Sequence, residues 1–309
     1  MQIFRKLEDV PAGLGSTVLS VGNFDGVHRA HQTVLSALAT RAKELKASSL
    51  VVTFDPHPTR VLRPEAAPKL ITPLDRKLEL IARFGVDAAV LIPFTKEFSL
   101  TSPKEFAELL GGRFRAKEVH EGFNFHFGHR AEGNLGKLNE LGKQAGFAVI
   151  SYPEMRVRGE SVSSSRIREL MQKGDVSRAR ALLGRTFSII AQPAKGRGYG
   201  KQYTAPTINL SAYDELVPGN GVYITRTRIA TETFNSVTNV GNRPTFGADS
   251  FAIESHLLDF HPIDLNEATE IETCFLRRLR NEIKFPSVEA LRSQIGKDVG
   301  RAQRYFRLL

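Results

Sequence analysis

Cysteine is nearly absent from this sequence, whose 309 residues include one, Cys274. A single thiol can form neither an internal disulfide nor a cysteine-rich metal site, so we expect a protein of a reducing compartment. The N-terminal stretch MQIFRKLEDV lacks the apolar core of a signal peptide, and no apolar run approaches the length that spans a membrane. These absences favour a soluble cytoplasmic protein with no membrane partner.

Acidic residues are in the minority: 33 stand against 43 lysines and arginines, which leaves a net charge of +10. The excess is concentrated in residues 156–185, where eight arginines and lysines accompany three acids. Such a cluster is typical of a phosphate-binding site, and a general basic surface is the simpler alternative. A third alternative is an RNA-binding or regulatory protein. That stretch has no aromatic residues to stack on bases, so we expect no nucleic-acid partner.

Short β-branched runs alternate with helical patterns in the first half of the chain. Apolar spacing predicts helices over residues 31–46, 75–84 and 103–110, the last with Ser102 as its cap and Pro103 in its first turn. The predicted strands are residues 16–21, 49–54, 88–93, 116–121 and 147–152. This alternation predicts an α/β fold with a parallel sheet, which binds ligands beyond the carboxyl ends of its strands.

The pattern changes beyond Gly184. Two short helices over residues 163–183, divided at residues 173–175, are followed by strand-like runs with Gly, Pro and Asn turns. These runs are residues 186–191, 222–229, 233–240, 251–258 and 271–279, and a helical pattern returns near residue 287. The pattern predicts a small antiparallel barrel or sandwich closed by C-terminal helices. We therefore expect two domains, residues 1–183 and 184–309.

Residues 21–32, VGNFDGVHRAHQ, follow the first predicted strand and open the first helix. Gly22 and Gly26 allow tight turns and close approach of a ligand, and a helix N-terminus favours a phosphate. His28 and His31 lie three residues apart, so both can donate hydrogen bonds to charge that develops on that phosphate. Two histidines alone would more often be surface or capping residues, and zinc would lack a third ligand nearby. The glycine-bracketed context favours a nucleotide site.

Three further segments lie at the ends of predicted strands in the same half: TFDPHP (53–58), GFNFHFG (122–128) and VSSSRIR (162–168). Each has an ordinary explanation, since prolines make loops, aromatics fill cores and serines cap helices. The last segment is the most informative, because hydroxyls at a helix start followed by arginines are suited to clamp a phosphate.

The order of these motifs resembles the adenylyltransferase module of prokaryotic bifunctional riboflavin kinase/FAD synthetases, which are Rossmann-like nucleotidyltransferases with an HxGH motif. The resemblance implies that His28 and His31 are catalytic, contacting the ATP phosphates and stabilising the transition state. The residues implied to bind ATP or flavin are Gly22, Phe24, Asp25, Asp55, His57, Asn124, Ser163, Ser164 and Arg168. HxGH reads HRAH here, with Ala30 in place of glycine. A riboflavin kinase with a weakened or lost adenylyltransferase module is therefore the nearest alternative.

A second group of motifs lies in the other half. GRGYGKQYTAPTINL (196–210) has alternating glycines whose N–H groups can hold phosphate oxygens, although a flexible linker has the same composition. No Walker lysine motif follows, so the segment is not a P-loop. Thr207 and Asn209 would point the same way in a strand and offer two neutral oxygens to Mg²⁺. Glu254 can accept a proton from a substrate hydroxyl, although an isolated strand glutamate more often faces solvent.

This second group resembles the antiparallel β-barrel riboflavin kinase module of the same family, together with the segments at 218–223, 239–247, 253–260 and 275–285. Its PTxN motif matches Thr207 and Asn209, which implies Mg²⁺–ATP coordination, and its catalytic base matches Glu254. The residues implied to bind ATP in this module are Gly196, Gly198, Gly200, Lys201, Thr207 and Asn209. Tyr203-Thr204 and the DLNEAT segment (264–269) depart from the family pattern at loop positions.

The resemblance spans residues 15–305 and implies two ATP-dependent reactions. Riboflavin and ATP would give FMN and ADP in the C-terminal barrel, and FMN and ATP would give FAD and diphosphate in the N-terminal module. It implies Mg²⁺ as a cofactor, ATP as the co-substrate and FMN and FAD as products. The sequence is also compatible with self-association.

Overall fold

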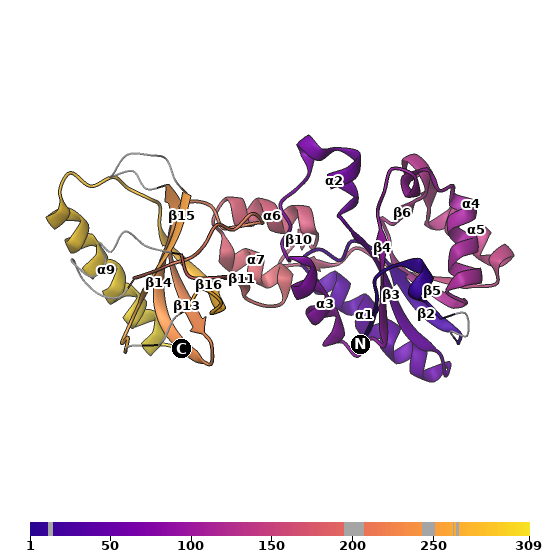
Figure 1. The fold of residues 1–309 in the computed structure, drawn as a ribbon, viewed down its shortest axis with the longest axis horizontal. Coiled ribbons are helices and arrows are strands. Elements are labelled where there is room, and N and C mark those ends of the chain that lie inside the picture. The colour runs from indigo at the N-terminus through magenta and orange to yellow at the C-terminus, as the bar shows by residue number, and fades with distance from the viewer. Residues whose placement is uncertain (12–14, 195–206, 243–250, 262, 264–265) are drawn as a thin grey trace. The chain divides into compact units, whose positions relative to one another are not determined.

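The computed structural model describes residues 1–11, 15–194, 207–242, 251–261, 263 and 266–309. The chain divides into two compact units, Met1–Ser164 and Ser165–Leu309. Each unit has its own sheet and its own apolar core (Figure 1).

A six-stranded parallel sheet forms the centre of the first unit. Its strands, in spatial order, are β1 (Gln2–Phe4), β4 (Ala88–Pro93), β3 (Ser48–Asp55), β2 (Thr17–Val21), β5 (Ala116–Gly122) and β8 (Ala148–Tyr152). All five predicted strands of this half are confirmed. Strand β1 was not predicted, because three residues are too few to show a period.

Helices cover both faces of this sheet. They are α1 (Arg29–Glu44), α2 (Pro58–Leu62), α3 (Leu74–Ala82), α4 (Pro103–Glu108) and α5 (Leu135–Ala145), with short turns η1 (Leu7–Asp9), η2 (Pro64–Ala66), η3 (Phe98–Leu100), η4 (Leu109–Arg113) and η5 (His129–Ala131). Two small hairpins complete the unit: β6 (His126–Phe127) with β7 (Gly133–Asn134), and β9 (Arg156–Val157) with β10 (Glu160–Ser161).

The strand alternation explains why two apolar layers form. Val18 and Val51 pack with α1 and α3 on one face of the sheet, whereas Leu19 and Leu50 pack with α4 and α5 on the other. The predicted capping of α4 is confirmed, since Ser102 forms a reciprocal capping box with Glu105.

Strand β2 lies at the point where the strand order reverses. The chain continues from β2 to β3 and β4 on one side, and then returns to β5 and β8 on the other. In sheets of this kind ligands bind in the crevice beyond the carboxyl ends of the strands that flank the reversal. Gly22 follows β2 and Gly122 ends β5, so two of the sequence motifs open directly onto this crevice.

The second unit begins with two short helices, α6 (Ser164–Gln172) and α7 (Val176–Leu183), divided at Gly174 as predicted. An antiparallel sheet follows: β11 (Phe187–Ala191), β16 (Ile271–Arg280), β13 (Gly221–Ile229), β14 (Glu232–Asn242), β15 (Phe251–Leu257) and β12 (Thr207–Asn209), in spatial order. Its edge strands β11 and β12 approach each other where Pro193 bridges to Leu210. This contact closes the sheet into the predicted small barrel.

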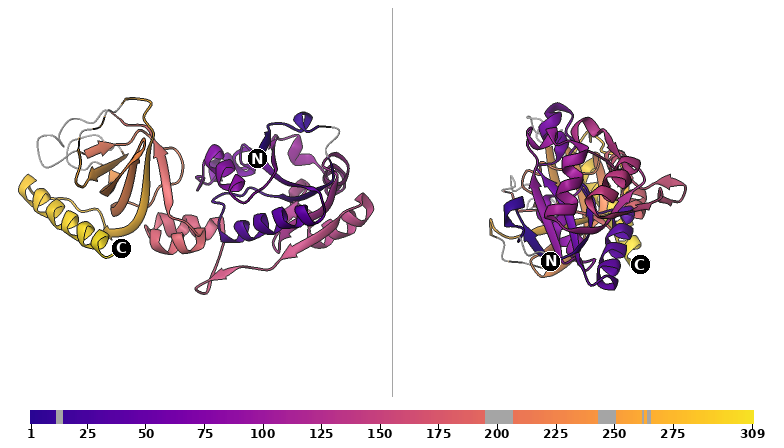
Figure 2. Two further views of the ribbon diagram at one scale, coloured as in Figure 1. Left: turned by 90° about the horizontal axis from the view of Figure 1, so that it is seen from below. Right: turned by 90° about the vertical axis from the view of Figure 1, so that its right-hand side faces the viewer.

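Helix α9 (Val288–Arg307) covers one face of the barrel, as Figure 2 shows. Its N-cap is Ser287, whose side chain accepts a hydrogen bond from the Ala290 N–H. Ala302 packs on Val222, Ile224 and Val237 of the sheet. A partly buried ion pair also joins the helix to the sheet, because Arg280 of β16 donates to the buried Asp298 carboxylate at 2.9 Å.

We expect Asp298→Ala to lower the free energy of unfolding of the second unit by about 3 kcal/mol, because it leaves the Arg280 charge without its buried partner. Urea unfolding followed by circular dichroism would measure the change. Lys297→Ala, at the exposed neighbouring position, is the matched control. Equal midpoints for the two variants would contradict the assignment of this ion pair to helix docking.

Candidate functional sites

The turn that follows β2 has an unusual backbone. Gly26 has a φ of 83°, and the non-glycine residues Phe24 and Val27 have φ values of 48° and 37°. Side-chain-bearing residues rarely adopt this region, and such strain persists where surrounding contacts enforce it. Here the side chains of Phe24 and Val27 are buried in the apolar layer beneath α1.

His28 and His31 lie at the start of α1, where that turn ends. Their rings stack with centroids 3.6 Å apart and an interplanar angle of 15°. His28 is the N-cap, and its Nδ1 accepts a hydrogen bond from the His31 N–H at 3.4 Å. A neutral imidazole that accepts at Nδ1 carries its proton at Nε2, so that nitrogen can donate to an anion. The pair therefore combines a helix N-terminus with an imidazole donor.

Asp25 lies inside this turn and is 3% exposed. Its carboxylate accepts hydrogen bonds from the Ile71 and Thr72 N–H groups at 3.0 Å, and the Thr72 hydroxyl accepts from the Gly26 N–H at 2.9 Å. The Ser164 hydroxyl donates to the Asp25 carbonyl at 2.8 Å. These contacts hold the turn in place, while a direct contact of Asp25 or Ser164 with a ligand stays a prediction.

The other predicted residues of this half occupy the same edge of the sheet, with one exception. Asp55 ends β3 and is exposed, and His57 caps α2 by accepting from the Thr59 N–H at 3.3 Å. Asn124 is exposed just beyond β5. Ser163 lies directly before α6 and is partly buried. Arg168, on α6, belongs to the second compact unit.

Two buried ionisable residues at this edge were missed by the sequence analysis: Lys77 of α3 and Glu121 of β5. The available signal for Lys77 was its position beside Leu74, Leu78 and Ile81, on the apolar side of a predicted helix. Glu121 has a weaker signal, a carboxylate near the end of a strand that has to be buried on both faces.

Glu121 bridges β2 and β5 where these strands part. Their pairing ends at Leu19 and Val119, and beyond it the Glu121 Oε1 accepts a hydrogen bond from the Val21 N–H at 2.6 Å. Burial raises the pKa of Glu121 well above its ordinary value, although the bond from Val21 opposes the rise. Folding therefore costs more for the ionised carboxylate than for the neutral acid.

We expect Glu121→Gln to stabilise the first unit increasingly as the pH rises. A raised pKa in the folded state means that the contribution of Glu121 is fully present below about pH 4.5 and is lost as the pH rises toward the folded-state value. Glutamine keeps the acceptor for Val21 and cannot ionise. Thermal melts at pH 5 and pH 8 should show a higher midpoint for Glu121→Gln than for the unsubstituted protein, and the difference should be larger at pH 8. A pH-independent difference, or the same difference for exposed Glu65→Gln, would contradict the prediction.

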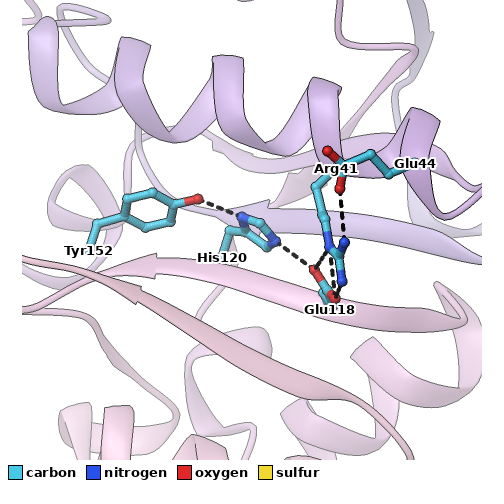
Figure 3. Close-up of polar contacts among 5 residues, drawn as sticks. All are labelled: Arg41, Glu44, Glu118, His120 and Tyr152. Carbon is cyan, nitrogen blue, oxygen red and sulfur yellow. Dashed lines mark hydrogen bonds and ion pairs between the residues drawn. The ribbon is translucent and has the colours of Figure 1, made fainter.

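A wide groove of about 1070 Å³ runs beside α1, over β5 and β8. A chain of polar contacts lies along it (Figure 3). The Tyr152 hydroxyl is 2.8 Å from His120 Nδ1, and His120 Nε2 is 3.2 Å from Glu118. Arg41 of α1 donates to Glu118 at 2.8 Å and to Glu44 at 2.8 Å.

The charges in this chain of contacts have clear causes. The bond from Arg41 is the main reason that the pKa of Glu118 is lowered, whereas burial lowers the pKa of His120 and raises that of Tyr152. An ionised Glu118 accepts from Nε2–H of a neutral His120, whose Nδ1 then accepts from the Tyr152 hydroxyl. The contacts thus fasten the helix that begins at the two histidines to the strand that leads to Asn124.

The barrel brings three of the predicted kinase residues together. Asn209 of β12 is paired in register with Glu254 of β15, and Glu254 is paired on its other side with Asn239 of β14, which was not predicted as a site residue. Asn209, Glu254 and Asn239 therefore form a row across adjacent strands. Thr207 is paired with His256 in the next row on the same face. His256 was not predicted as a site residue, although it stands two residues from Glu254 in the same alternating strand. Burial lowers its pKa.

Five hydroxyl side chains line part of the barrel interior behind this row, among apolar residues such as Tyr223 and Phe275. Thr238 contacts Thr225 at 2.7 Å and Ser255 at 2.8 Å, and Ser236 contacts Thr225 and Thr227 at 2.7 and 2.8 Å. All five side chains are fully buried. Because these bonds join β13, β14 and β15, they help to fix the register that places Glu254 opposite the two asparagines.

Four of the residues predicted to bind ATP in the kinase module are not among those that the structure describes. These are Gly196, Gly198, Gly200 and Lys201. Within the described ranges, the structure has no group of three or more His, Cys, Asp or Glu side chains that could hold a metal ion. A metal at Thr207 and Asn209 would therefore be held by neutral oxygens, with its remaining ligands supplied by phosphates and water.

Comparison with known proteins identifies two family models in the chain. The FAD synthetase model matches residues 11–166, and the riboflavin kinase model matches residues 183–306. A bifunctional riboflavin kinase/FMN adenylyltransferase from Haemophilus influenzae is 33% identical over 308 residues, covering 99% of both chains. The enzyme of the same name from Pseudomonas fluorescens is 34% identical over 305 residues, covering 98% of this chain and 97% of its own.

A solved structure is similar over almost the whole chain as well. It is the crystal structure of a macrolide-efflux protein from Streptococcus pneumoniae, with a TM-score of 0.86 and 25% identity, covering 97% of this chain and 98% of that one. The word efflux is part of the name given to that protein. In the part of the chain described here, no helix is long and apolar enough to cross a membrane.

Proposed function

Because the chain belongs to the bifunctional riboflavin kinase/FMN adenylyltransferase family, we propose which of its residues carry each of the two reactions. The enzyme phosphorylates riboflavin to FMN with one ATP and adenylylates FMN to FAD with a second. Neither reaction needs a covalent intermediate on the protein. Both depend on alignment of the reactants and on stabilisation of charge at phosphorus.

Riboflavin phosphorylation takes place in the barrel. Glu254 accepts the proton of the 5′-hydroxyl as its oxygen attacks the γ-phosphate of ATP, and ADP leaves. Thr207 and Asn209 would hold Mg²⁺, which when bound neutralises phosphate charge. Their neutral oxygens fit an ion that keeps phosphate and water ligands. The observation that supports this set best is the register that places Asn209 opposite Glu254.

FMN adenylylation takes place at the carboxyl edge of the parallel sheet. A phosphate oxygen of FMN attacks the α-phosphate of ATP, and diphosphate leaves. His28 and His31 stabilise the charge that develops there, as the stacked pair at the start of α1 suggests. Gly22, Phe24 and Asp25 shape the turn, and Asp55 and His57 adjoin the flavin. Asn124, Ser163, Ser164 and Arg168 contact nucleotide and diphosphate.

The test is a single incubation of riboflavin, ATP and Mg²⁺, with FMN and FAD separated by chromatography. A second incubation supplies FMN and ATP directly and measures FAD and diphosphate. It separates the bifunctional enzyme from the second candidate, a riboflavin kinase whose adenylyltransferase module is weakened or lost, which the alanine at position 30 suggests. Ala30 lies in the first turn of α1, where helical geometry accepts an alanine. We expect FAD to form in both incubations.

Three further proposals concern the whole protein. The kinase module begins near residue 184, so that residues 1–183 form the adenylyltransferase module. The protein acts in the cytoplasm, where ATP is available to both sites. The third proposal is that copies of the chain can associate, and size-exclusion chromatography with light scattering would test it.

A further inference from the structure

Lys77 is a buried lysine at the carboxyl ends of β2 and β3. It is 7% exposed. Its Nζ donates to the Thr53 hydroxyl at 3.0 Å and to the Asn23 carbonyl at 3.2 Å. Lysines are rarely buried unless their charge is matched, so this position is costly for an ordinary structural residue.

The surroundings of Lys77 supply matching charge from two elements. A small pocket that it lines also contains Asp25, from the turn after β2, Asp55, from the end of β3, and His57, from the cap of α2. Burial lowers the pKa of the Lys77 ammonium to about 8, and the two aspartates oppose that effect. The ammonium is therefore present at neutral pH and is lost in mild alkali.

The two atoms that Lys77 holds belong to different motifs. Asn23 directly precedes Phe24, the first residue of the turn with a positive φ, and this turn leads to His28. Thr53 opens the TFDPHP segment, which leads to Asp55 and His57. Lys77 thus joins the backbone that carries the histidines to the strand that carries the other loop.

We propose that Lys77 is a positioning residue for adenylyl transfer, whose ammonium fixes the spacing between the Asn23–His28 turn and the Thr53–His57 loop. The inference rests on the proposed roles of those two segments. Adenylyl transfer requires the attacking phosphate of FMN in line with the α-phosphate of ATP, and a displacement of about 1 Å can lower a rate about 100-fold. Because Lys77 acts through its neighbours, its loss should lower kcat and leave the two KM values nearly unchanged.

The experiment compares the full chain with Lys77→Met, Lys77→Arg and the exposed control Lys96→Met. FMN and FAD formation are measured separately between pH 6.5 and 9.5. We expect Lys77→Met to lower kcat for FAD formation about 100-fold, with KM for FMN and for ATP within about threefold and FMN formation unchanged. Lys96→Met should match the unsubstituted protein in both reactions.

The pH profile provides a readout that a purely structural role would not change. FAD formation by the unsubstituted protein should fall on the order of tenfold between pH 7.5 and 9.5, reversibly, while FMN formation does not follow it. In Lys77→Arg, whose guanidinium stays charged, the fall should disappear and at least about a tenth of the rate should remain.

Three results would overturn the proposal: an unchanged alkaline fall in Lys77→Arg, FAD formation by Lys77→Met within threefold of normal, or a loss that lies in KM alone. The first decides the matter even if Lys77→Met does not fold. His28→Ala serves as the reference for the reaction itself. Loss of FAD formation by this variant at every pH would support the histidine site. The role of Lys77 is judged separately, from the fall in FAD formation between pH 7.5 and 9.5.

Discussion

His28→Ala is expected to lower FAD formation from FMN and ATP by about 100- to 1000-fold while FMN formation from riboflavin continues at its normal rate. Removal of one preoriented donor to a developing oxyanion has an effect of this size. The kinase reaction should be untouched, because Glu254 and its neighbours belong to the other compact unit. Chromatography of both products from the same samples would measure the two rates.

The second role of His28 calls for a matched variant. His28 also caps α1, so alanine removes an acceptor for the His31 N–H and costs about 1 kcal/mol of stability in addition. Serine restores the cap but is too short to place a donor where Nε2 lies. We therefore expect His28→Ser to fold like the parent and to lose FAD formation almost as fully as alanine.

Exposed Lys43, near the other end of α1, provides the control, and Lys43→Ala should leave both rates unchanged. If His28→Ser instead restored FAD formation, the imidazole would matter only as a cap. If His28→Ala abolished FMN formation as well in a folded protein, the two reactions would not have separate sites.

Much of the first unit could be predicted from sequence because its signals are local. Strands β2, β3 and β4 are rich in β-branched and other apolar residues, and the face of α1 repeats at helical spacing through Val34, Leu35 and Leu38. Parallel strands then place all their carboxyl ends at one edge, so motifs that follow three strands were expected to meet there. The structure brings the 22–28, 53–58 and 122–124 segments to that edge.

The residues that support this edge could not be predicted in the same way. The carboxylate of Asp25 is held by the loop at Ile71 and Thr72, more than 40 residues away in the chain, and such contacts leave no periodic trace in the sequence. Lys77 looks like one charged residue of an amphipathic helix until its neighbours are known. The role of Glu121 could be predicted only if the point where strands β2 and β5 separate were known. Local patterns thus locate the site, whereas long-range packing determines what holds it together.

The barrel also shows what local sequence patterns leave undetermined. The strands of this half were predicted from their turns and β-branched runs, but the sequence does not state which residues lie opposite one another. Asn209 and Glu254 are 45 residues apart and become neighbours only through the register of β12 and β15. A slip of one residue would turn Glu254 into the interior, among buried hydroxyl groups and apolar side chains such as Val240 and Ile253.

This register leads to the second large effect. Glu254→Gln should lower FMN formation by about 100- to 10,000-fold, because the amide has nearly the size of the carboxylate but cannot accept the proton of the riboflavin hydroxyl. FAD formation from supplied FMN should be unchanged, while FAD formation from riboflavin should disappear with its precursor. Glu254→Asp should retain part of the rate, since it keeps a base one methylene further from the substrate.

The control for the barrel is Glu270→Gln, an exposed glutamate of the same unit. Matching thermal midpoints for all three variants would show that any loss comes from chemistry, because the interior hydroxyl bonds that fix the strands are untouched. If Glu254→Gln made FMN within threefold of the normal rate, the proton would have another acceptor. His256, two residues along the same face, would then be the next residue to substitute.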